Sequence, residues 1–272
     1  MTIKLITIDV DGTLVNSKSE LTQHTIDILK KAIDRGVKIV IASGRPTAGT
    51  KNFFQALGID NLENQYAINY NGAIVANTKG DVITEDTLTF DDYKKIAKLA
   101  DELNIPYQIE TADYIITPFA KIPKYTVFEA NLVNMPVWHL PIENTPTDSD
   151  IAKVMFIDEP EKIEKTLPLI PATFKQEFNV MKSAPVFIEF IKKTVSKGLA
   201  LQQLAEKLKI DISQTMAIGD QGNDLSMLEK AGVSVAMGNA IPELKQIADF
   251  VTKTNDEDGV AYAIEKFILN DN

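Results

Sequence analysis

Blocks of apolar residues alternate with amphipathic segments along the first part of the chain. Residues 3–10 form an apolar run that ends in acidic residues, which predicts a buried strand leading into a loop. Residues 22–35 carry apolar residues on one helical face and are followed by Gly36, a typical helix stop. Residues 37–42 form a second apolar strand, and a helix to Leu57 follows. This strand–helix–strand–helix order predicts right-handed βαβ units and a parallel sheet.

The pattern changes near residue 84. Before this point, residues 66–75 predict a strand, an Asn-Gly turn and a return strand. After it, Asp91 is positioned to cap a helix that ends near Leu103, and another helix is predicted at 159–167. Short strand-like segments dominate the rest of this region, at 106–110, 114–118, 137–140, 152–157 and 186–191. Consecutive strands with few helices between them predict an α+β module with an antiparallel sheet.

The alternation of strands and helices returns after Ser196, with predicted strands at 215–220 and 233–238 and helices between and after them. The pattern therefore predicts an α/β fold in which a Rossmann-like core with a parallel sheet is interrupted by an inserted α+β domain. We expect the core to comprise residues 1–80 and 194–272, and the insertion to comprise residues 81–193.

Composition narrows the classes of function. The net charge of −10 disfavours binding to nucleic acid or anionic lipid, and no apolar stretch approaches the roughly 18 residues of a membrane span. The absence of cysteine excludes disulfides, thiolate metal sites and thiol catalysis. The two histidines, His24 and His139, lie in no motif, so a histidine-based triad is disfavoured. The N-terminal apolar run is too short for a secretory signal, and we expect a cytoplasmic protein.

Two carboxylates follow the first predicted strand, in the segment Asp9-Val10-Asp11-Gly12-Thr13-Leu14. Carboxylates two positions apart in one turn repel each other unless a cation or a proton compensates. Magnesium is the usual hard cation beside a phosphate. One carboxylate can then attack phosphorus while the other protonates the leaving oxygen. A plain surface turn is the alternative, and an EF-hand is excluded because Gly12 stands at the wrong loop position.

A second polar segment, Ser43-Gly44-Arg45-Pro46, follows the second strand and begins a predicted helix. A hydroxyl and backbone amides at such a junction suit a phosphate oxygen. Gly44 and Gly49 have the glycine spacing of a P-loop, but Thr50-Lys51 reverses the required order of lysine and hydroxyl. No P-loop therefore results.

Two further polar segments lie in the last third of the chain. Lys197 stands at a predicted helix start, where a lysine opposes the helix dipole unless an anion is bound there. A solvated surface lysine is the alternative. The segment Gly219-Asp220-Gln221-Gly222-Asn223-Asp224 follows a strand, and its carboxylates can complete a metal site begun by Asp9. An acidic turn that caps the next helix is the alternative. We expect all of these segments at the carboxyl edge of the sheet, where open parallel sheets bind ligands.

In their order along the chain, the four segments resemble the motifs of the haloacid dehalogenase (HAD) superfamily of phosphohydrolases. The insertion that follows Asn71-Gly72-Ala73, and the stretch GDQGNDLSMLEKAGVSVAMGNA at 219–240, resemble the Cof-type sugar-phosphatase branch. The resemblance implies a HAD core with an inserted α+β cap. It also implies a magnesium-dependent phosphatase that acts on phosphate monoesters of small metabolites, sugar phosphates in particular.

The resemblance also implies roles for individual residues. Asp9 would be the nucleophile and a magnesium ligand, and Asp11 the general acid and base, with its main-chain carbonyl on the metal. Asp220 would be the third protein ligand, and Asp224 would support the metal or its waters. The phosphate would be held by Ser43, Gly44, Lys197, Asn223 and the amide of Val10.

Other functions remain open at this stage. A phosphomutase also forms an aspartyl phosphate, and a phosphate sensor would keep the metal site without turnover. An ATPase is disfavoured because no nucleotide motif is present. Tyr114, Tyr125 and Trp138 in the insertion can stack on a sugar or belong to its core, and we favour the core. The sequence does not name the substrate, and protein partners are unknown.

Overall fold

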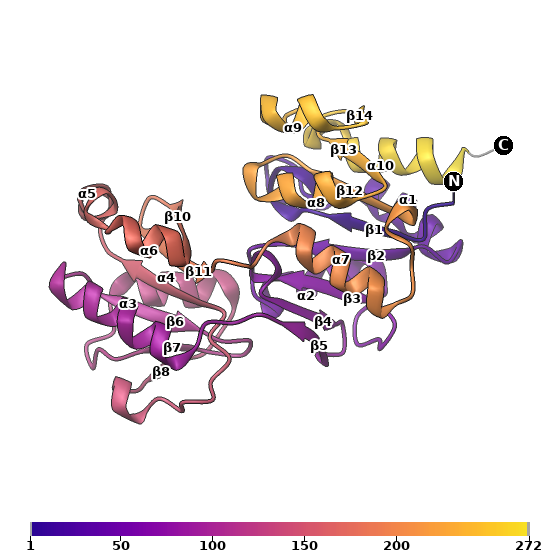
Figure 1. Ribbon diagram of the computed structural model, residues 1–272. Helices are drawn as coiled ribbons and strands as arrows, with labels where there is room; N and C mark the ends of the chain where they lie inside the picture. Colours follow the sequence, from indigo (N-terminus) through magenta and orange to yellow (C-terminus); the bar gives the residue numbers. More distant parts are fainter. Residues whose placement is uncertain (1, 271–272) are drawn as a thin grey trace. The chain divides into compact units, whose positions relative to one another are not determined.

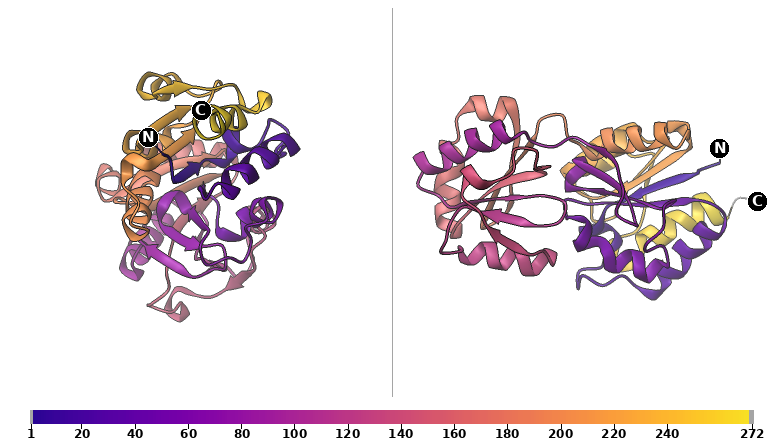
Figure 2. Two further views of the ribbon diagram at one scale, coloured as in Figure 1. Left: turned by 90° about the vertical axis from the view of Figure 1, so that its right-hand side faces the viewer. Right: turned by 90° about the horizontal axis from the view of Figure 1, so that it is seen from below.

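The computed structural model describes residues 2–270, which divide into two compact units (Figures 1 and 2). Of the described residues, the first unit contains 2–85 and 196–270, and the second contains Asp86–Val195. The first boundary between the two units falls after residue 85, whereas the sequence pattern placed it after residue 80. The difference arises because Val82–Glu85 pairs with the sheet of the first unit.

An eight-stranded sheet runs through the first unit. Its order is β14 (Phe250–Val251), β13 (Val233–Ala236), β12 (Thr215–Gly219), β1 (Leu5–Ile8), β2 (Lys38–Ala42), β3 (Tyr66–Asn69), β4 (Ile74–Asn77), β5 (Val82–Glu85). Pairing is parallel from β14 to β3, and β4 and β5 are antiparallel. Every residue of β1 and β12 is buried, because helices cover both faces of the sheet. The predicted parallel α/β core is confirmed.

Helices of the first unit form a layer on each face of its sheet (Figure 2). One layer contains α7 (Lys197–Lys207), α8 (Leu225–Lys230) and α9 (Pro242–Ile247). The other contains α1 (Gln23–Asp34), α2 (Lys51–Leu57) and α10 (Gly259–Ile264). None of the helices formed by residues 2–270 combines the length and apolar character that a membrane crossing requires.

The second unit is built on a six-stranded sheet. Its order is β10 (Phe178–Ala184), β11 (Phe187–Lys192), β9 (Lys153–Ile157), β6 (Tyr107–Glu110), β7 (Ile115–Thr117), β8 (Val137–His139). The pairing is antiparallel except between β7 and β8, which are parallel because α4 (Lys124–Val133) connects them as a crossover. The expectation of a wholly antiparallel sheet is wrong in this one pair.

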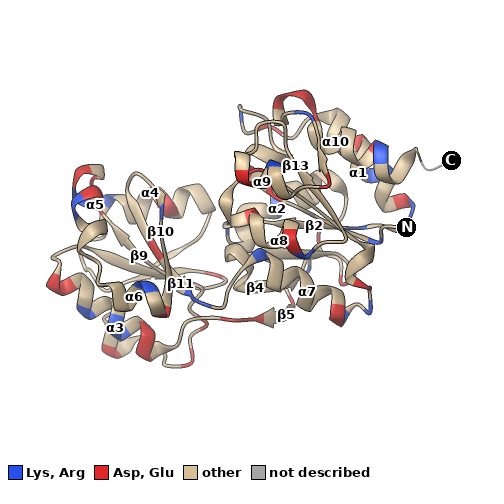
Figure 3. Ribbon diagram, turned by 45° about the horizontal axis from the view of Figure 1, so that its top comes forward, with Lys and Arg blue, Asp and Glu red and all other residues tan. Residues whose placement is uncertain are grey.

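One face of this second sheet packs against three helices, α3 (Phe90–Glu102), α5 (Pro160–Thr166) and α6 (Ala172–Glu177). Helix α3 is capped by Thr89, whose hydroxyl accepts from Asp92 N at 3.1 Å, and not by Asp91 as the sequence suggested. Thr89 has the extended backbone that an N-cap requires, and the Asp92 carboxylate accepts a hydrogen bond from the Thr89 N–H. Most charged residues of both units lie on helices and loops, which leaves the strands largely uncharged (Figure 3).

Candidate functional site

Three of the predicted site residues follow adjacent strands of the first unit. Asp9 follows β1, Ser43 follows β2 and Asp220 follows β12. Because β1 pairs in parallel with both β2 and β12, the carboxyl ends of these strands meet at one edge of the sheet. This edge collects side chains that are far apart in the sequence.

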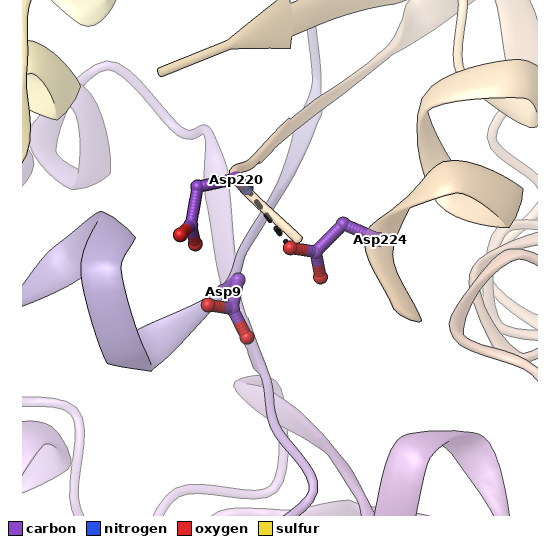
Figure 4. A group of neighbouring side chains, drawn as sticks. All are labelled: Asp9, Asp220 and Asp224. Atoms are coloured by element: carbon purple, nitrogen blue, oxygen red, sulfur yellow. Dashed lines mark hydrogen bonds between the residues drawn. The ribbon is translucent and has the colours of Figure 1, made fainter. Parts of the chain in front are cut away.

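Three aspartates form a buried carboxylate group at this edge. Asp9, Asp220 and Asp224 each offer an oxygen, and these oxygens lie within 4.8 Å of one another. Their residues are 6%, 2% and 0% exposed. Figure 4 shows the three side chains as neighbours, with a hydrogen bond between the Asp220 backbone and Asp224. Such an arrangement is unstable unless positive charge is placed beside it.

Lys197 supplies part of that charge. Its ammonium donates to Asp9 Oδ1 at 2.5 Å and to Asp224 Oδ1 at 2.7 Å, and its side chain is fully buried. Lys197 is the first residue of α7, so these carboxylates are the anions that offset its unfavourable position at the helix N-terminus. A Cβ atom on Gly198 would lie 2.1 Å from the carbonyl oxygen of Ser226, so this glycine lets the start of α7 pack closely on α8.

Hydrogen bonds fix the orientation of the two C-terminal aspartates. Asp224 Oδ2 accepts from the backbone N–H groups of Asp220 and Gln221, each at 3.0 Å. Asp220 Oδ1 accepts from the Thr13 hydroxyl at 2.8 Å, and its Oδ2 accepts from the Gln221 side chain at 3.1 Å. Sequence reasoning did not assign roles to Thr13 or Gln221, although both lie inside the motifs that it singled out.

The electrostatics of the group follow from burial and from the short contacts. Burial raises the pKa of Asp9 to about 7, while Lys197 opposes the rise and Asp224 adds to it. Burial also raises the pKa of Asp220. Burial lowers the pKa of Lys197, but Asp9 and Asp224 outweigh it and raise the pKa to about 12.

The donor set fits a divalent cation. When all three carboxylates are ionised, the single ammonium leaves a net charge of about −2 in a buried site, and a hard dication with oxygen ligands would neutralise it. Asp224 already uses both oxygens, for Lys197 and for backbone amides. Within the described residues, Asp9 Oδ2 accepts no hydrogen bond and is available for a ligand.

The other predicted phosphate contacts lie next to these aspartates in the chain or at the end of the neighbouring strand β2. Val10 and Ser43 are buried, and the Ser43 hydroxyl accepts from Arg45 N at 3.1 Å. Asn223 is exposed and donates to Asn71 Oδ1 at 3.1 Å. A Cβ atom on Gly44 would lie 3.2 Å from the same Asn71 side chain. Asn71 therefore contacts both the second and the fourth motif. The sequence pattern predicted only an Asn-Gly turn at this position.

The Asp11 carboxylate does not join the buried group. It is 62% exposed and accepts two hydrogen bonds from Arg45, from Nη2 at 2.6 Å and from Nε at 3.1 Å. The backbone reverses at Gly12, where φ is +81°, and a Cβ there would meet Asp220 Oδ2 at 2.5 Å. Sequence reasoning placed Arg45 in the second motif but gave it no role.

The aromatic residues of the second unit have different environments. Trp138 is 49% exposed and stacks on Tyr114, with ring centroids 4.5 Å apart, so the interpretation of Trp138 as a core residue is wrong. Tyr114 and Tyr125 are half-buried against apolar clusters, and the Tyr125 hydroxyl donates to Glu159 at 2.7 Å. The His139 side chain is exposed beside Trp138 at the end of β8.

Comparison with known proteins identifies the family of this chain. The sequence model of the family of haloacid dehalogenase-like hydrolases matches residues 6–264 of this chain. YxeH of Bacillus subtilis, named only provisionally as a phosphatase, is 41% identical over 267 residues, which cover 98% of each chain.

Solved structures share the fold. A haloacid dehalogenase-like hydrolase from Bacteroides thetaiotaomicron has a TM-score of 0.86 at 31% identity, covering 98% of this chain and 100% of its own. A subclass IIB sugar phosphatase, BT4131, has a TM-score of 0.76 at 25% identity, covering 97% and 98%. The family match and these relatives show that the chain belongs to the haloacid dehalogenase-like hydrolases, as a phosphatase of the Cof-type branch.

Proposed function

We propose that this phosphatase hydrolyses phosphate monoesters of small cytoplasmic metabolites, sugar phosphates first among them, with magnesium and through an aspartyl phosphate on Asp9. The observation that carries the proposal is the buried group of Asp9, Asp220 and Asp224 with Lys197 bridging two of its members. The sugar-phosphate class is supported by the likeness to BT4131, which is named a sugar phosphatase.

In the proposed first step, Asp9 attacks phosphorus. Its Oδ1 is held by Lys197, which leaves Oδ2 free to form the new P–O bond while the bond to the leaving oxygen breaks. Lys197 stabilises negative charge that develops on the transferred group. The proton for the leaving oxygen would come from Asp11.

In the second step, Asp11 would take a proton from water, whose oxygen attacks phosphorus and releases Asp9 and inorganic phosphate. Ser43, the Gly44 and Val10 amides, and Asn223 would hold the phosphate oxygens in both steps. Asp9, Asp220 and the Asp11 carbonyl would hold magnesium, with Asp224 orienting the site through its bonds to backbone amides. A bound magnesium ion supplies neutralisation of the phosphate and of the Asp9 carboxylate, so that one anion can approach another.

The test is phosphate release from p-nitrophenyl phosphate and from a panel of sugar phosphates, with magnesium or with EDTA. Asp9→Asn should lower kcat at least 1,000-fold, roughly the scale of losing a covalent nucleophile. Asp34→Asn, a change at an exposed carboxylate on α1, is the matched control and should retain wild-type activity. An active Asp9→Asn variant, or activity unaffected by EDTA, would contradict the proposal.

A further inference from the structure

Arg45 is one of only two arginines, with Arg35, among the 28 lysines and arginines of the chain. Its guanidinium forms a two-pronged contact in which Nη2 and Nε donate to different oxygens of Asp11. A lysine at this position would be a point charge and would not reproduce this planar fork. Both oxygens of Asp11 are therefore engaged by one side chain.

This contact conflicts with the role of general acid and base that the proposed function assigns to Asp11. A carboxyl group must bring one oxygen within hydrogen-bond reach of the leaving oxygen to protonate it. Asp11 lies outside the group of Asp9, Asp220 and Asp224, and its oxygens already accept from Arg45. The pair must therefore open in every catalytic cycle.

The structure makes such opening easy. The two side chains are 32% and 62% exposed, and exposed ion pairs are held weakly. The backbone of Arg45 is fixed, since its N–H donates to the Ser43 hydroxyl at 3.1 Å and its carbonyl accepts from Tyr70 N and from the Asn69 side chain, each at 3.2 Å. Opening the pair therefore requires movement of the two side chains and not of the Arg45 backbone.

We propose that Arg45 is a positioning residue that keeps the Asp11 carboxylate away from the leaving oxygen in the free enzyme. When substrate binds, one of its oxyanions pairs with the Arg45 guanidinium in place of Asp11, and Asp11 is released. The inference rests on the proposed function of Asp11. A guanidinium fork fits the oxygens of a phosphate as well as those of a carboxylate, so the exchange replaces one charge-assisted pair by another. Ser43 and Gly44, the proposed phosphate contacts, immediately precede Arg45 in the chain.

The first test measures binding of inorganic phosphate by calorimetry, in magnesium, to wild type, Asp11→Ala, Arg45→Met and the double variant. If Asp11 competes for Arg45, Asp11→Ala should tighten phosphate binding about two- to fivefold, the scale of an exposed pair. In the Arg45→Met background the same change should have no effect. Equal tightening in both backgrounds would show simple charge repulsion and would overturn the proposal.

The second test observes Arg45 directly. With only two arginines, the Nε–H signals in a nitrogen-15 NMR spectrum can be assigned by Arg45→Lys and Arg35→Lys. The Arg45 signal should shift when phosphate and magnesium are added and also in Asp11→Ala, while the Arg35 signal stays in place. An Arg45 signal unmoved by phosphate would overturn the proposal.

Kinetics separate this inference from the proposed function. Arg45→Met should raise KM for a sugar phosphate about tenfold and change kcat less, and Arg45→Lys should restore part of the loss because it keeps the charge. A loss of kcat with unchanged KM would contradict the positioning role. If Asp9→Asn is inactive, but Asp11→Ala changes phosphate affinity equally with and without Arg45, only the inference fails. If Asp9→Asn remains active, the proposed function itself fails.

Discussion

Gly12 connects backbone conformation to the carboxylate group. Its φ of +81° is strained for any residue with a side chain, and a Cβ would lie 2.5 Å from Asp220 Oδ2. Gly12→Ala should therefore displace Asp220 and weaken magnesium binding at least roughly tenfold. This is the scale of effect seen when a metal ligand, or a group that orients it, is misplaced. Calorimetric titration with magnesium would measure the change.

Gly36→Ala provides the matched control for this prediction. Gly36 has nearly the same φ, +85°, but has no atom within 4 Å of the added Cβ. Both variants should lose about 1–2 kcal/mol of stability through backbone strain, and only Gly12→Ala should lose magnesium affinity. Equal magnesium affinity in the two variants would show that Asp220 does not depend on the space at Gly12.

At the scale of elements, the sheet of the second unit buries a charged cluster. Lys153 on β9 has its ammonium 3.3 Å from a Glu110 oxygen on β6, 3.0 Å from a Glu189 oxygen on β11 and 3.8 Å from a Glu129 oxygen on α4. All four side chains are at most 9% exposed. Three strands and one helix are thus tied together by one ammonium, with more carboxylates than it can neutralise.

This excess of carboxylates makes stability depend on pH. Burial raises the pKa of Glu110 from its ordinary 4.5 to about 7; Lys153 opposes the rise, while Glu129 and Glu189 add to it. Between these two pH values the folded protein keeps a proton that the unfolded chain releases. The free energy of unfolding should therefore fall as pH rises from about 4.5 to about 7.

Glu110→Gln tests this coupling because it removes the titration and leaves the shape. Relative to wild type, the variant should gain about 1–3 kcal/mol of stability between pH 5 and pH 8, measured by urea unfolding. Glu102→Gln, at an exposed position in α3, is the control and should follow wild type at every pH. A Glu110→Gln curve parallel to that of wild type would contradict the prediction.

At the scale of the whole molecule, each unit has its own apolar core. The ends of the second unit are tied within it, because Asp86 pairs with Lys192 at 2.5 Å and accepts from the Thr194 hydroxyl. A separately expressed Asp86–Val195 segment should therefore fold alone. The fluorescence of Trp138, the single tryptophan, should report one cooperative urea transition. A gradual change without a transition would show that this unit depends on the rest of the chain.

Much of this fold was predictable because the pattern of each core element is local. The apolar runs of β1, β2 and β12 need only their own residues to be recognised, and the carboxyl ends of parallel strands must share an edge. The sequence therefore sufficed to bring Asp9, Ser43 and Asp220 to one place. Helix α4 and strand β10 were missed, because α4 is apolar on several sides and the edge strand β10 is half exposed, so neither shows a clear period.

Only the tertiary structure decided which side chains touch. Lys197 and Asp9 lie 188 residues apart in the sequence, and their contact depends on how the start of α7 packs in the first unit. The pairing of Asp11 with Arg45, and the cluster around Lys153, likewise join residues of different elements. Periodicity and propensity describe neighbours in sequence, whereas an ion pair depends on distances that only packing sets. The sequence thus determined the chemical groups and their edge of the sheet, and packing determined their partners.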